Sequence, residues 1–428
     1  MSGFSLGVDD GVTRGARAMV ALPDLGGAAT RSTESRLEEA AALAGAIGLD
    51  VVETKAVRVR APKAATLFGS GQVEAIADMV RANDVELVVV DAGITPIQQK
   101  NLEDALCAKV IDRTGLILEI FGERAASAEG RLQVELAHLD YQAGRLVRSW
   151  THLERQRGGF GFLGGPGETQ IEADRRLIRE RMARLRRELG QVTRTRTLHR
   201  ARRQRAPWPV IALVGYTNAG KSTLFNRLTG AHVMAEDLLF ATLDPTMRQI
   251  SLPGIDKAIL SDTVGFVSEL PTQLIAAFRA TLEEVTNADL IIHVRDIAHP
   301  DSDAQAEDVR DVLAELGMGE VQVIEAWNKI DALDEAVREK VAAEAVRRDY
   351  VTLVSAVTGE GVGALLTAAA AHLTRGSRLR EVTVPAADGS TLAWLHAHGD
   401  VVGQQLDGEA VRLRVRLGEA DWARFQAR

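Results

Sequence analysis

The stretch Val210-Ile-Ala-Leu-Val-Gly-Tyr-Thr-Asn-Ala-Gly-Lys-Ser222 decides the fold of a large part of this chain. Five apolar residues, a length typical of a buried strand, lead directly into the pattern G-x-x-x-x-G-K-S, and residues 221–228 are predicted to begin a helix. In such a strand–loop–helix unit, backbone N–H groups of the loop converge on a phosphate group at the positive end of the helix. The stretch therefore predicts an α/β domain that binds a nucleoside triphosphate.

Four residues of this loop have separate predicted roles. Gly215 and Gly220 allow the backbone to turn without a Cβ clash. The Lys221 ammonium group is expected to reach the β- and γ-phosphates, and the Ser222 hydroxyl is expected to bind Mg²⁺. The alternative is a glycine-rich loop that matches by chance, which the preceding strand and the later segments disfavour.

Asp262-Thr-Val-Gly265 is the second segment that suits the phosphates, and it follows a predicted strand end at residues 258–260. We expect the Asp262 carboxylate to hold Mg²⁺ through water and the Gly265 N–H to sense the γ-phosphate.

The polar, proline-broken stretch Phe240-Ala-Thr-Leu-Asp-Pro-Thr246 lies between these two segments. Its composition suits a switch loop in which Thr242 closes on Mg²⁺ when the triphosphate is bound. Thr246 is a nearby competitor for that role.

Asn328-Lys-Ile-Asp331 indicates which base is bound, and it follows an apolar strand at residues 321–324. An aspartate carboxylate at position 331 can accept both N1–H and N2–H of guanine, which adenine cannot offer. A site built on such hydrogen bonds rejects the wrong base, because its polar groups stay unpaired. An ordinary turn is the alternative, and the order and spacing of the segments disfavour it.

Other groups complete the predicted guanine site. Asn328 is expected to meet the Hoogsteen edge of the base, and the Lys329 stem is expected to cover the ring. Ser355-Ala356 follows a predicted strand at residues 351–354 and offers a backbone N–H to guanine O6.

The residues expected to contact GTP or GDP share these five segments and are Gly215, Tyr216, Thr217, Asn218, Ala219, Gly220, Lys221, Ser222, Thr223, Phe240, Ala241, Thr242, Leu243, Asp244, Asp262, Thr263, Val264, Gly265, Asn328, Lys329, Ile330, Asp331, Ser355, Ala356 and Val357. The groups expected to act in hydrolysis are Lys221, Thr242 and Gly265. The expected Mg²⁺ ligands are Ser222, Thr242 and, through water, Asp262.

The hydrolytic chemistry lacks one usual part. Water-activating GTPases often place Gln after Asp-x-x-Gly, but Phe266 stands there and can neither orient nor deprotonate water. Intrinsic hydrolysis is therefore expected to be slow. Asn218 is a candidate ligand for a K⁺ ion that neutralises charge in the transition state. The alternative is an Asn that only stabilises its own loop.

Composition sets further limits. One cysteine, Cys107, excludes an internal disulfide and fits a reducing cytosol, and its apolar helical surroundings predict a packing role. The chain has no signal peptide pattern and no run of the ~18 apolar residues that a membrane span needs. We therefore expect a cytoplasmic protein, and nothing in the sequence demands more than a monomer.

A basic segment stands out against the net charge of −8: residues 175–205 contain 13 arginines and only two acidic residues. Such a segment on an acidic protein is a candidate nucleic-acid footprint. The alternative is a solvated helix face with acidic partners elsewhere.

Apolar residues spaced by alternating steps of three and four predict two coiled-coil helices around this segment. They are Leu132, Leu136, Leu139, Ala143, Leu146, Trp150 and Leu153, and then Ile171, Ile178, Met182, Leu185 and Leu189. A glycine-rich loop at residues 158–167 joins the two, which predicts an antiparallel hairpin.

The tip of that hairpin carries aromatic and basic side chains suited to stacking on bases and holding phosphates. The candidate RNA contacts are Arg155, Arg157, Phe160, Phe162, Arg175 and Arg176. The alternative is a flexible linker whose phenylalanines fold back on the hairpin.

The predicted order of domains is a terminus without structure at residues 1–16, an α/β domain at 17–124, the hairpin with its basic linker at 125–206, the P-loop GTPase domain at 207–376 and a small α/β appendage at 377–428. In the first of these domains, strands are predicted at 18–22, 51–59 and 87–90. Helices are predicted at 32–47, with Ser32 or Thr33 as cap, and at 71–83.

Gly164-Gly-Pro-Gly-Glu-Thr-Gln-Ile-Glu-Ala-Asp-Arg-Arg176, together with the loop at 215–222, resembles the HflX family of ribosome-associated GTPases. Asp262-Thr-Val-Gly-Phe266 and Phe240-Ala-Thr-Leu-Asp244 resemble the switch segments of that family, including the hydrophobic residue in place of Gln. The similarity covers about residues 17–376.

The resemblance implies that the N-terminal domain and the hairpin dock on the large (50S) ribosomal subunit and its RNA, with the hairpin tip towards the peptidyl-transferase region. The GTP-bound protein would split stalled 70S ribosomes, and hydrolysis would release it. Two alternatives share the same nucleotide site: a GTPase that assists ribosomal RNA or tRNA maturation, and a nucleotide-dependent switch that binds a protein.

Overall fold

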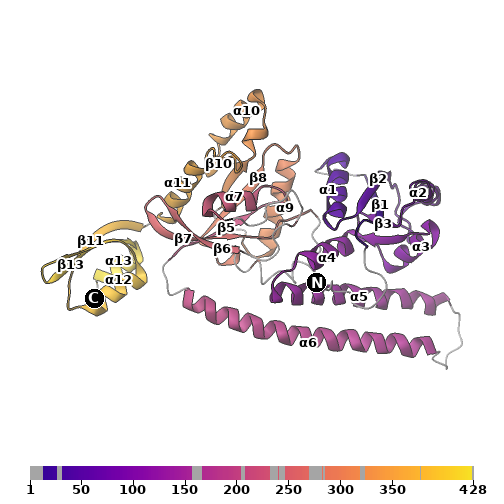
Figure 1. The fold of residues 1–428 in the computed structure, drawn as a ribbon, viewed down its shortest axis with the longest axis horizontal. Helices are drawn as coiled ribbons and strands as arrows, with labels where there is room; N and C mark the ends of the chain where they lie inside the picture. Colours follow the sequence, from indigo (N-terminus) through magenta and orange to yellow (C-terminus); the bar gives the residue numbers. More distant parts are fainter. Residues whose placement is uncertain are drawn as a thin grey trace. The chain divides into compact units, whose positions relative to one another are not determined.

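The computed structural model describes residues 13–26, 31–156, 166–203, 208–231, 240, 246–268, 282, 285–318, 323–375 and 377–426 (Figure 1). Its contacts group the chain into two compact units, the first formed by residues 1–190 with 238–243 and 269–278, and the second by the rest. Within the described part of the chain, no helix combines the length and the apolar character needed to span a membrane.

The first unit begins with a parallel sheet in the order β2-β1-β3-β4. The strands are β1 (Arg17–Asp24), β2 (Asp50–Arg58), β3 (Leu87–Val90) and β4 (Lys109–Asp112). Helices α2 (Ser70–Ala82) and α3 (Pro96–Leu106) pack on one face, and α1 (Thr33–Ala46) and α4 (Arg113–Arg124) lie on the other (Figure 1). The three predicted strands and two predicted helices are present, whereas β4, α3 and α4 were not predicted.

Local sequence explains where these helices start. The Ser32 hydroxyl accepts the Ser35 N–H at 3.1 Å and caps α1, as predicted for this residue. Thr95 and Gln98 form a reciprocal capping box at the start of α3, and Pro96 occupies its first turn.

Two expectations for this unit are wrong. Residues 13–16 have structure: Arg14 pairs with Glu123 at 3.2 Å, and the Gly15 N–H donates to the Gly48 carbonyl at 2.8 Å. Residues 1–12 lie outside the described residues. Cys107 is not packed in a helix but is exposed at the end of α3, where its φ of 52° ends the helix in the left-handed region.

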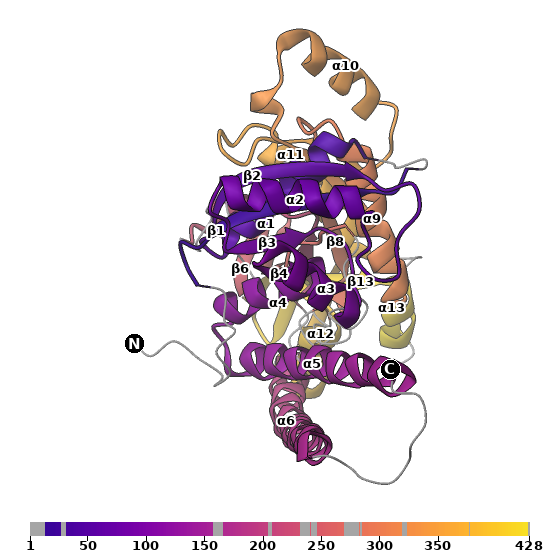
Figure 2. The same cartoon turned by 90° about the vertical axis from the view of Figure 1, so that its right-hand side faces the viewer.

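Helices α5 (Ala128–Gln156) and α6 (Pro166–Arg203) form the predicted hairpin: Figure 1 shows them side by side, and Figure 2 looks almost along α6 while α5 crosses the view. Leu132, Leu136 and Leu139 of α5 pack with Ile178, Met182 and Leu185 of α6. The predicted apolar seam is therefore confirmed at these positions. Proline fits the first turn of a helix, so α6 begins inside the glycine-rich stretch, and its helical part includes much of the expected basic linker.

Asp112 anchors the hairpin to the parallel sheet. Its buried carboxylate accepts the Gly115 N–H at 2.8 Å and caps α4. The same carboxylate accepts the Tyr141 hydroxyl and the Arg145 guanidinium of α5, both at 2.6 Å. Burial and the nearby Asp112 charge raise the pKa of Tyr141, which keeps that hydroxyl a donor.

The second unit contains a six-stranded sheet in the order β10-β9-β8-β5-β7-β6, parallel except for β6. The strands are β5 (Val210–Val214), β6 (Thr246–Leu252), β7 (Ile255–Asp262), β8 (Leu290–Asp296), β9 (Val323–Asn328) and β10 (Val351–Leu353). Helices α7 (Lys221–Thr229) and α11 (Val362–Leu373) pack on one face, α9 (Ser302–Glu315) contacts β8, and α10 (Glu335–Ala345) contacts β10. Because ligands bind at the carboxyl ends of parallel strands, the predicted loops meet at one edge.

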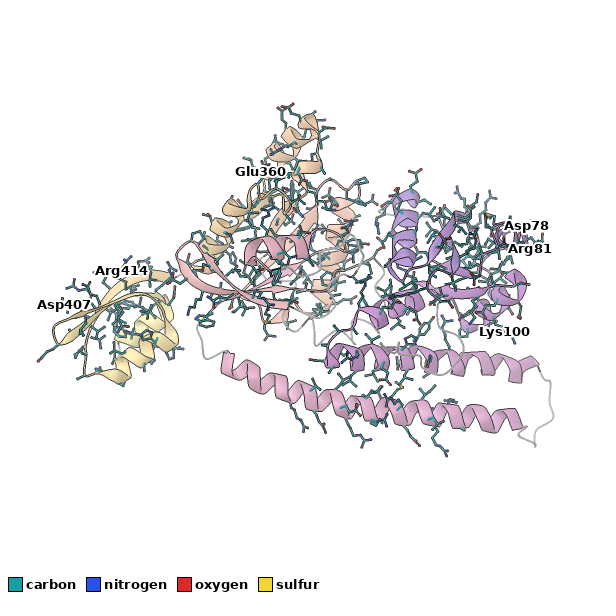
Figure 3. All side chains as sticks on the ribbon, in the orientation of Figure 1. Asp78, Arg81, Lys100, Glu360, Asp407 and Arg414 are labelled. Atoms are coloured by element: carbon teal, nitrogen blue, oxygen red, sulfur yellow. The ribbon has the colours of Figure 1, made fainter. Side chains whose placement is uncertain are left out.

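Residues 377–426 form a separate antiparallel sheet in the order β11-β13-β12. Its strands are β11 (Ser377–Pro385), β12 (Asp400–Asp407) and β13 (Ala410–Gly418), and its helices are α12 (Gly389–His398) and α13 (Glu419–Gln426). Leu395, Leu413 and Val415 are central to its core. Charged side chains such as Arg414 and Asp407 are exposed (Figure 3). The expected mixture of strands and short helices is present, with β12 as an addition.

We expect Asp112→Ala to lower the free energy of unfolding by about 3 kcal/mol, because removing one partner of a buried ion pair leaves the other uncompensated. Denaturant unfolding measures the change. The matched control is Asp78→Ala, which breaks an exposed pair with Arg81 at 2.5 Å (Figure 3) and should cost less than about 1 kcal/mol. Equal losses in the two variants would contradict the anchoring role.

Candidate functional site

The phosphate loop between β5 and α7 requires both of its glycines. Gly215 has a φ of 154°, and a Cβ atom there would lie 2.2 Å from the Val294 carbonyl oxygen. Gly220 has a φ of 92°, and its Cβ would lie 2.2 Å from Nδ2 of Asn328. The predicted need for glycine at both positions is therefore confirmed, and Gly220 packs directly against the predicted base-binding segment.

Lys221 is held beneath this loop. Its buried Nζ donates to the carbonyls of Gly215 at 3.0 Å and Tyr216 at 2.7 Å. Burial lowers the pKa of Lys221 to about 8, against an opposing effect from the Asp262 charge. An anionic ligand beside Nζ would favour the protonated form again, so this lysine suits a phosphate group.

Ser222 and Asp262 bring two oxygen donors together at the start of α7. The Ser222 hydroxyl donates to Oδ2 of Asp262 at 2.7 Å, and Asp262 is fully buried. A hydroxyl and a carboxylate are hard oxygen ligands of the kind Mg²⁺ prefers alongside phosphate oxygens. Within the described residues no cluster of three His, Cys, Asp or Glu side chains could hold a metal ion.

The segment after β7 lies directly on the phosphate loop. A Cβ at Gly265 would be 2.8 Å from Cγ2 of Thr217 and 3.2 Å from Nζ of Lys221. The Phe266 N–H donates to the Gly215 carbonyl at 3.1 Å, and the Phe266 carbonyl accepts the Thr217 N–H at 2.7 Å. Gly265 is thus beside the lysine, and the buried ring of Phe266 is in no position to orient water.

Of the expected switch loop at residues 240–246, only the two ends are described: Phe240, and Thr246, which begins β6. Ala241, Thr242, Leu243 and Asp244 lie outside the described residues. Phe240 is buried, has a φ of 58°, and packs edge-to-face against Phe121 of α4 with ring centroids 4.7 Å apart.

The amide group of Asn328 joins two loops. Nδ2 donates to the Ala219 carbonyl at 2.8 Å, and Oδ1 accepts the Ala356 N–H at 2.9 Å. Nδ2 carries two hydrogens, so the predicted contact with the Hoogsteen edge of the base stays a prediction for the second N–H. An O6 atom of guanine would share the Ala356 N–H with Asn328.

The loop at residues 355–361, which was predicted to bind the base, makes several further contacts. The Ser355 N–H donates to the Glu360 carbonyl at 2.9 Å, and Glu360 lies near the top of this unit in Figure 3. Arg227 of α7, which sequence reasoning missed, donates from Nε to the Ala356 carbonyl at 2.8 Å. Asp331 lies in a short 3₁₀ turn (Ile330–Ala332), and its exposed carboxylate accepts no hydrogen bond within the described part of the chain.

Asn218 and the hairpin arginines take less constrained positions. Asn218 is exposed, has a φ of 58°, and makes no side-chain hydrogen bond within the described residues. Arg176 is exposed on α6 and pairs with Glu180 at 3.8 Å, while Arg175 is partly buried. Arg157, Phe160 and Phe162 lie outside the described residues, as does the side chain of Arg155.

A polar network joins β8, β9 and the start of α9. Arg295 of β8 donates to Glu325 at 2.8 Å and to Asp303 at 2.6 Å. The Trp327 Nε1–H donates to the same Glu325 at 2.8 Å. Burial alone would raise the pKa of Glu325, but the hydrogen bonds from Trp327 and Arg295 outweigh burial and lower it. His293 pairs in register with Glu325, and burial lowers the pKa of His293 to about 3.

Four family descriptions match the chain in sequence order. They are the GTP-binding GTPase N-terminal region at residues 34–122, the GTP-binding GTPase middle region at 124–203, the 50S ribosome-binding GTPase at 210–329 and the HflX C-terminal domain at 340–428. The last match includes β10, an edge strand of the six-stranded sheet, and α11, which packs on that sheet.

Curated relatives align over almost the whole chain. GTPase HflX of Magnetococcus marinus is 51% identical over 91% of this chain and 90% of its own length. GTPase HflX of Escherichia coli is 40% identical over 91% of each. This chain belongs to the HflX family. As a member of that family it is a GTPase with the P-loop α/β fold, so the resemblance stated from the sequence is confirmed.

Solved structures include a GTP-binding protein from Sulfolobus solfataricus in complex with GDP. It is 23% identical to this HflX chain, with a TM-score of 0.43 over 83% of this chain and 99% of that one. Membership of the HflX family rests on the sequence relatives and the family matches.

Because His293 is buried in its neutral form, we expect the free energy of unfolding to fall in acid. The unfolded chain binds a proton at this histidine below a pH of about 6.5, whereas the folded protein keeps it neutral down to about 3. Stability therefore falls as the pH falls between these values. We expect His293→Gln to reduce the loss between pH 6.5 and 4.5 by about 2 kcal/mol, as measured by urea unfolding at each pH. His396→Gln, at an exposed position of α12, should keep the wild-type dependence, and unchanged behaviour of His293→Gln would reject the assignment.

Proposed function

We propose that this HflX-family GTPase binds the large ribosomal subunit in its GTP-bound state, splits stalled 70S ribosomes in the cytoplasm, and leaves after hydrolysis. The proposal rests on one observation. The same chain has a strongly basic helix and a sheet edge at which the predicted nucleotide-binding loops meet. Residues 175–205, mostly within α6, hold 13 arginines against two acidic residues. The match of residues 210–329 to a family described as 50S ribosome-binding GTPase supports the choice of partner.

The nucleotide would bind with its phosphates at residues 215–222 and its base at residues 328–331 and 355–357. Lys221 would neutralise charge on the β- and γ-phosphates, and the Gly265 N–H would respond to the γ-phosphate. Ser222 and Asp262 would hold Mg²⁺, which supplies charge neutralisation at the phosphates when it is bound. Thr242 remains a prediction for the same ion.

Hydrolysis requires a water oxygen to attack the γ-phosphorus in line with the bond to the β–γ bridging oxygen. That bond breaks, GDP leaves with the electron pair, and the water proton passes to the phosphate product or to solvent. Phe266 is buried against the loop and takes no part in orienting water. We therefore propose a slow intrinsic rate that the ribosome raises.

Potassium is a separate proposal, and its support is the exposed Asn218 in the phosphate loop. If the Asn218 side chain holds K⁺ near the developing charge, replacing K⁺ by Na⁺ at constant ionic strength should slow hydrolysis about tenfold or more. Asn218→Ala should remove the difference between the two ions. Equal wild-type rates in both salts would reject the ion site.

Co-sedimentation with 70S ribosomes and separated subunits, with a non-hydrolysable GTP analogue against GDP, tests the main proposal. We expect analogue-dependent binding to the large subunit and loss of 70S particles. Arg186→Glu, at an exposed position of α6, should weaken binding and its salt dependence. Arg414→Glu makes the same charge change on β13 (Figure 3) and should have the smaller effect.

Absence of ribosome binding in both nucleotide states would reject the proposal. Preference for naked RNA or a subunit precursor would favour a role in RNA maturation, and binding that hardly depends on salt would favour a protein partner.

A further inference from the structure

Asp296 stands at the carboxyl end of β8, next to the end of β9 from which the base-binding segment emerges. The two strands are parallel, and their register pairs Asp296 with Asn328. Lys329, the next residue, therefore begins its side chain beside the Asp296 carboxylate. Nζ of Lys329 lies 2.7 Å from Oδ2 of Asp296.

The Asp296 carboxylate is itself held in place. Its Oδ1 accepts the Ala298 N–H at 3.1 Å, and the Ile297 N–H donates to the Asn328 carbonyl at 3.0 Å. The loop after β8 is thus bonded both to the carboxylate and to β9. The buried pair of Arg295 and Glu325, at 2.8 Å, joins the same two strands one step further back. Lys329 is therefore tethered to a rigid partner rather than to another mobile side chain.

Lys329 also has a constrained backbone. Its φ of 67° lies in the left-handed region, which few residues other than glycine, asparagine and aspartate occupy. The 3₁₀ turn that carries Asp331 follows at once. The backbone fixes where the lysine side chain starts, and Asp296 fixes where it ends, so the four-carbon stem between them has little freedom left.

We propose that Asp296 is a positioning residue for the nucleotide base. It holds the Lys329 ammonium group so that the stem is already laid out as an apolar floor under the guanine ring before the ligand arrives. This inference rests on the proposed guanine site. A free lysine side chain must lose rotamer freedom when it covers a ligand, and an anchored one has lost it already.

The ion pair between Lys329 and Asp296 is partly exposed, with side-chain exposures of 30% and 14%. Ion pairs in contact with solvent contribute little to the free energy of unfolding, so we expect only a small effect on stability. Preorganisation of one flexible side chain instead predicts an effect on ligand affinity of about two- to tenfold. We therefore expect substitution of Asp296 to change the affinity for nucleotide more than the free energy of unfolding.

The test is a double-mutant cycle on GDP affinity, measured by calorimetry with wild-type protein, Asp296→Asn, Lys329→Ala and the double variant. We expect Asp296→Asn to weaken GDP binding about two- to tenfold in the wild-type background and to have no effect in the Lys329→Ala background. Inosine diphosphate, which lacks the 2-amino group, should lose affinity by the same factor on Asp296→Asn, because the face of the ring is affected and not its edge.

Glu344→Gln is the control. It removes the charge of an exposed ion pair with Arg348, at 2.5 Å, on α10 of the same unit, and should leave GDP affinity unchanged. The inference is overturned if Asp296→Asn changes nothing, or if it weakens binding equally with and without Lys329.

Asp331→Asn separates this inference from the site on which it rests. If that variant moves preference from GDP to xanthosine diphosphate while Asp296→Asn has no effect, the guanine site stands and only the role of Asp296 fails. If the wild-type protein does not bind GDP, the proposed site fails and the inference fails with it.

Discussion

The side-chain amide of Asn328 holds the phosphate end and the base end of the site at a fixed separation. One atom donates to the Ala219 carbonyl in the phosphate loop, and the other accepts the Ala356 N–H in the base loop. Gly220 must lack a side chain because this amide occupies the space. Arg227 ties the base loop to α7 as well. In the proposed site, these contacts would set the spacing between the loop for the phosphates and the loop for the base before the nucleotide binds.

Much of the fold could be predicted because its signals are local. The strand 210–214, its glycine loop and the helix after it occupy adjacent positions, and the apolar seam of the hairpin follows from residue spacing alone. The missed parts depend on contacts between distant segments. Arg227 and Ala356 are 129 positions apart, and no local pattern marks an arginine for that contact. Asp296 could have been suspected only once β8 was known to lie beside β9, because carboxyl ends of parallel neighbours meet.

The differences from expectation have the same origin. Asn328 also bonds to two other loops that the sheet places within its reach, and its neighbours in sequence do not reveal these contacts. Cys107 follows an apolar helical pattern, but the left-handed turn that ends α3 carries its side chain out to solvent. Phe266 is buried because its N–H donates to the Gly215 carbonyl and its carbonyl accepts the Thr217 N–H, which holds the segment on the phosphate loop. Hydrolytic competence must therefore come from groups outside this contact.

The exposed thiol of Cys107 gives the molecule a built-in attachment point. It is the sole cysteine of the sequence, and it lies at the end of α3 in the N-terminal sheet domain. A maleimide dye would attach to the unaltered protein at one position, so its fluorescence anisotropy would report docking of that domain on a large particle. The same experiment would require several substitutions in a protein with more thiols.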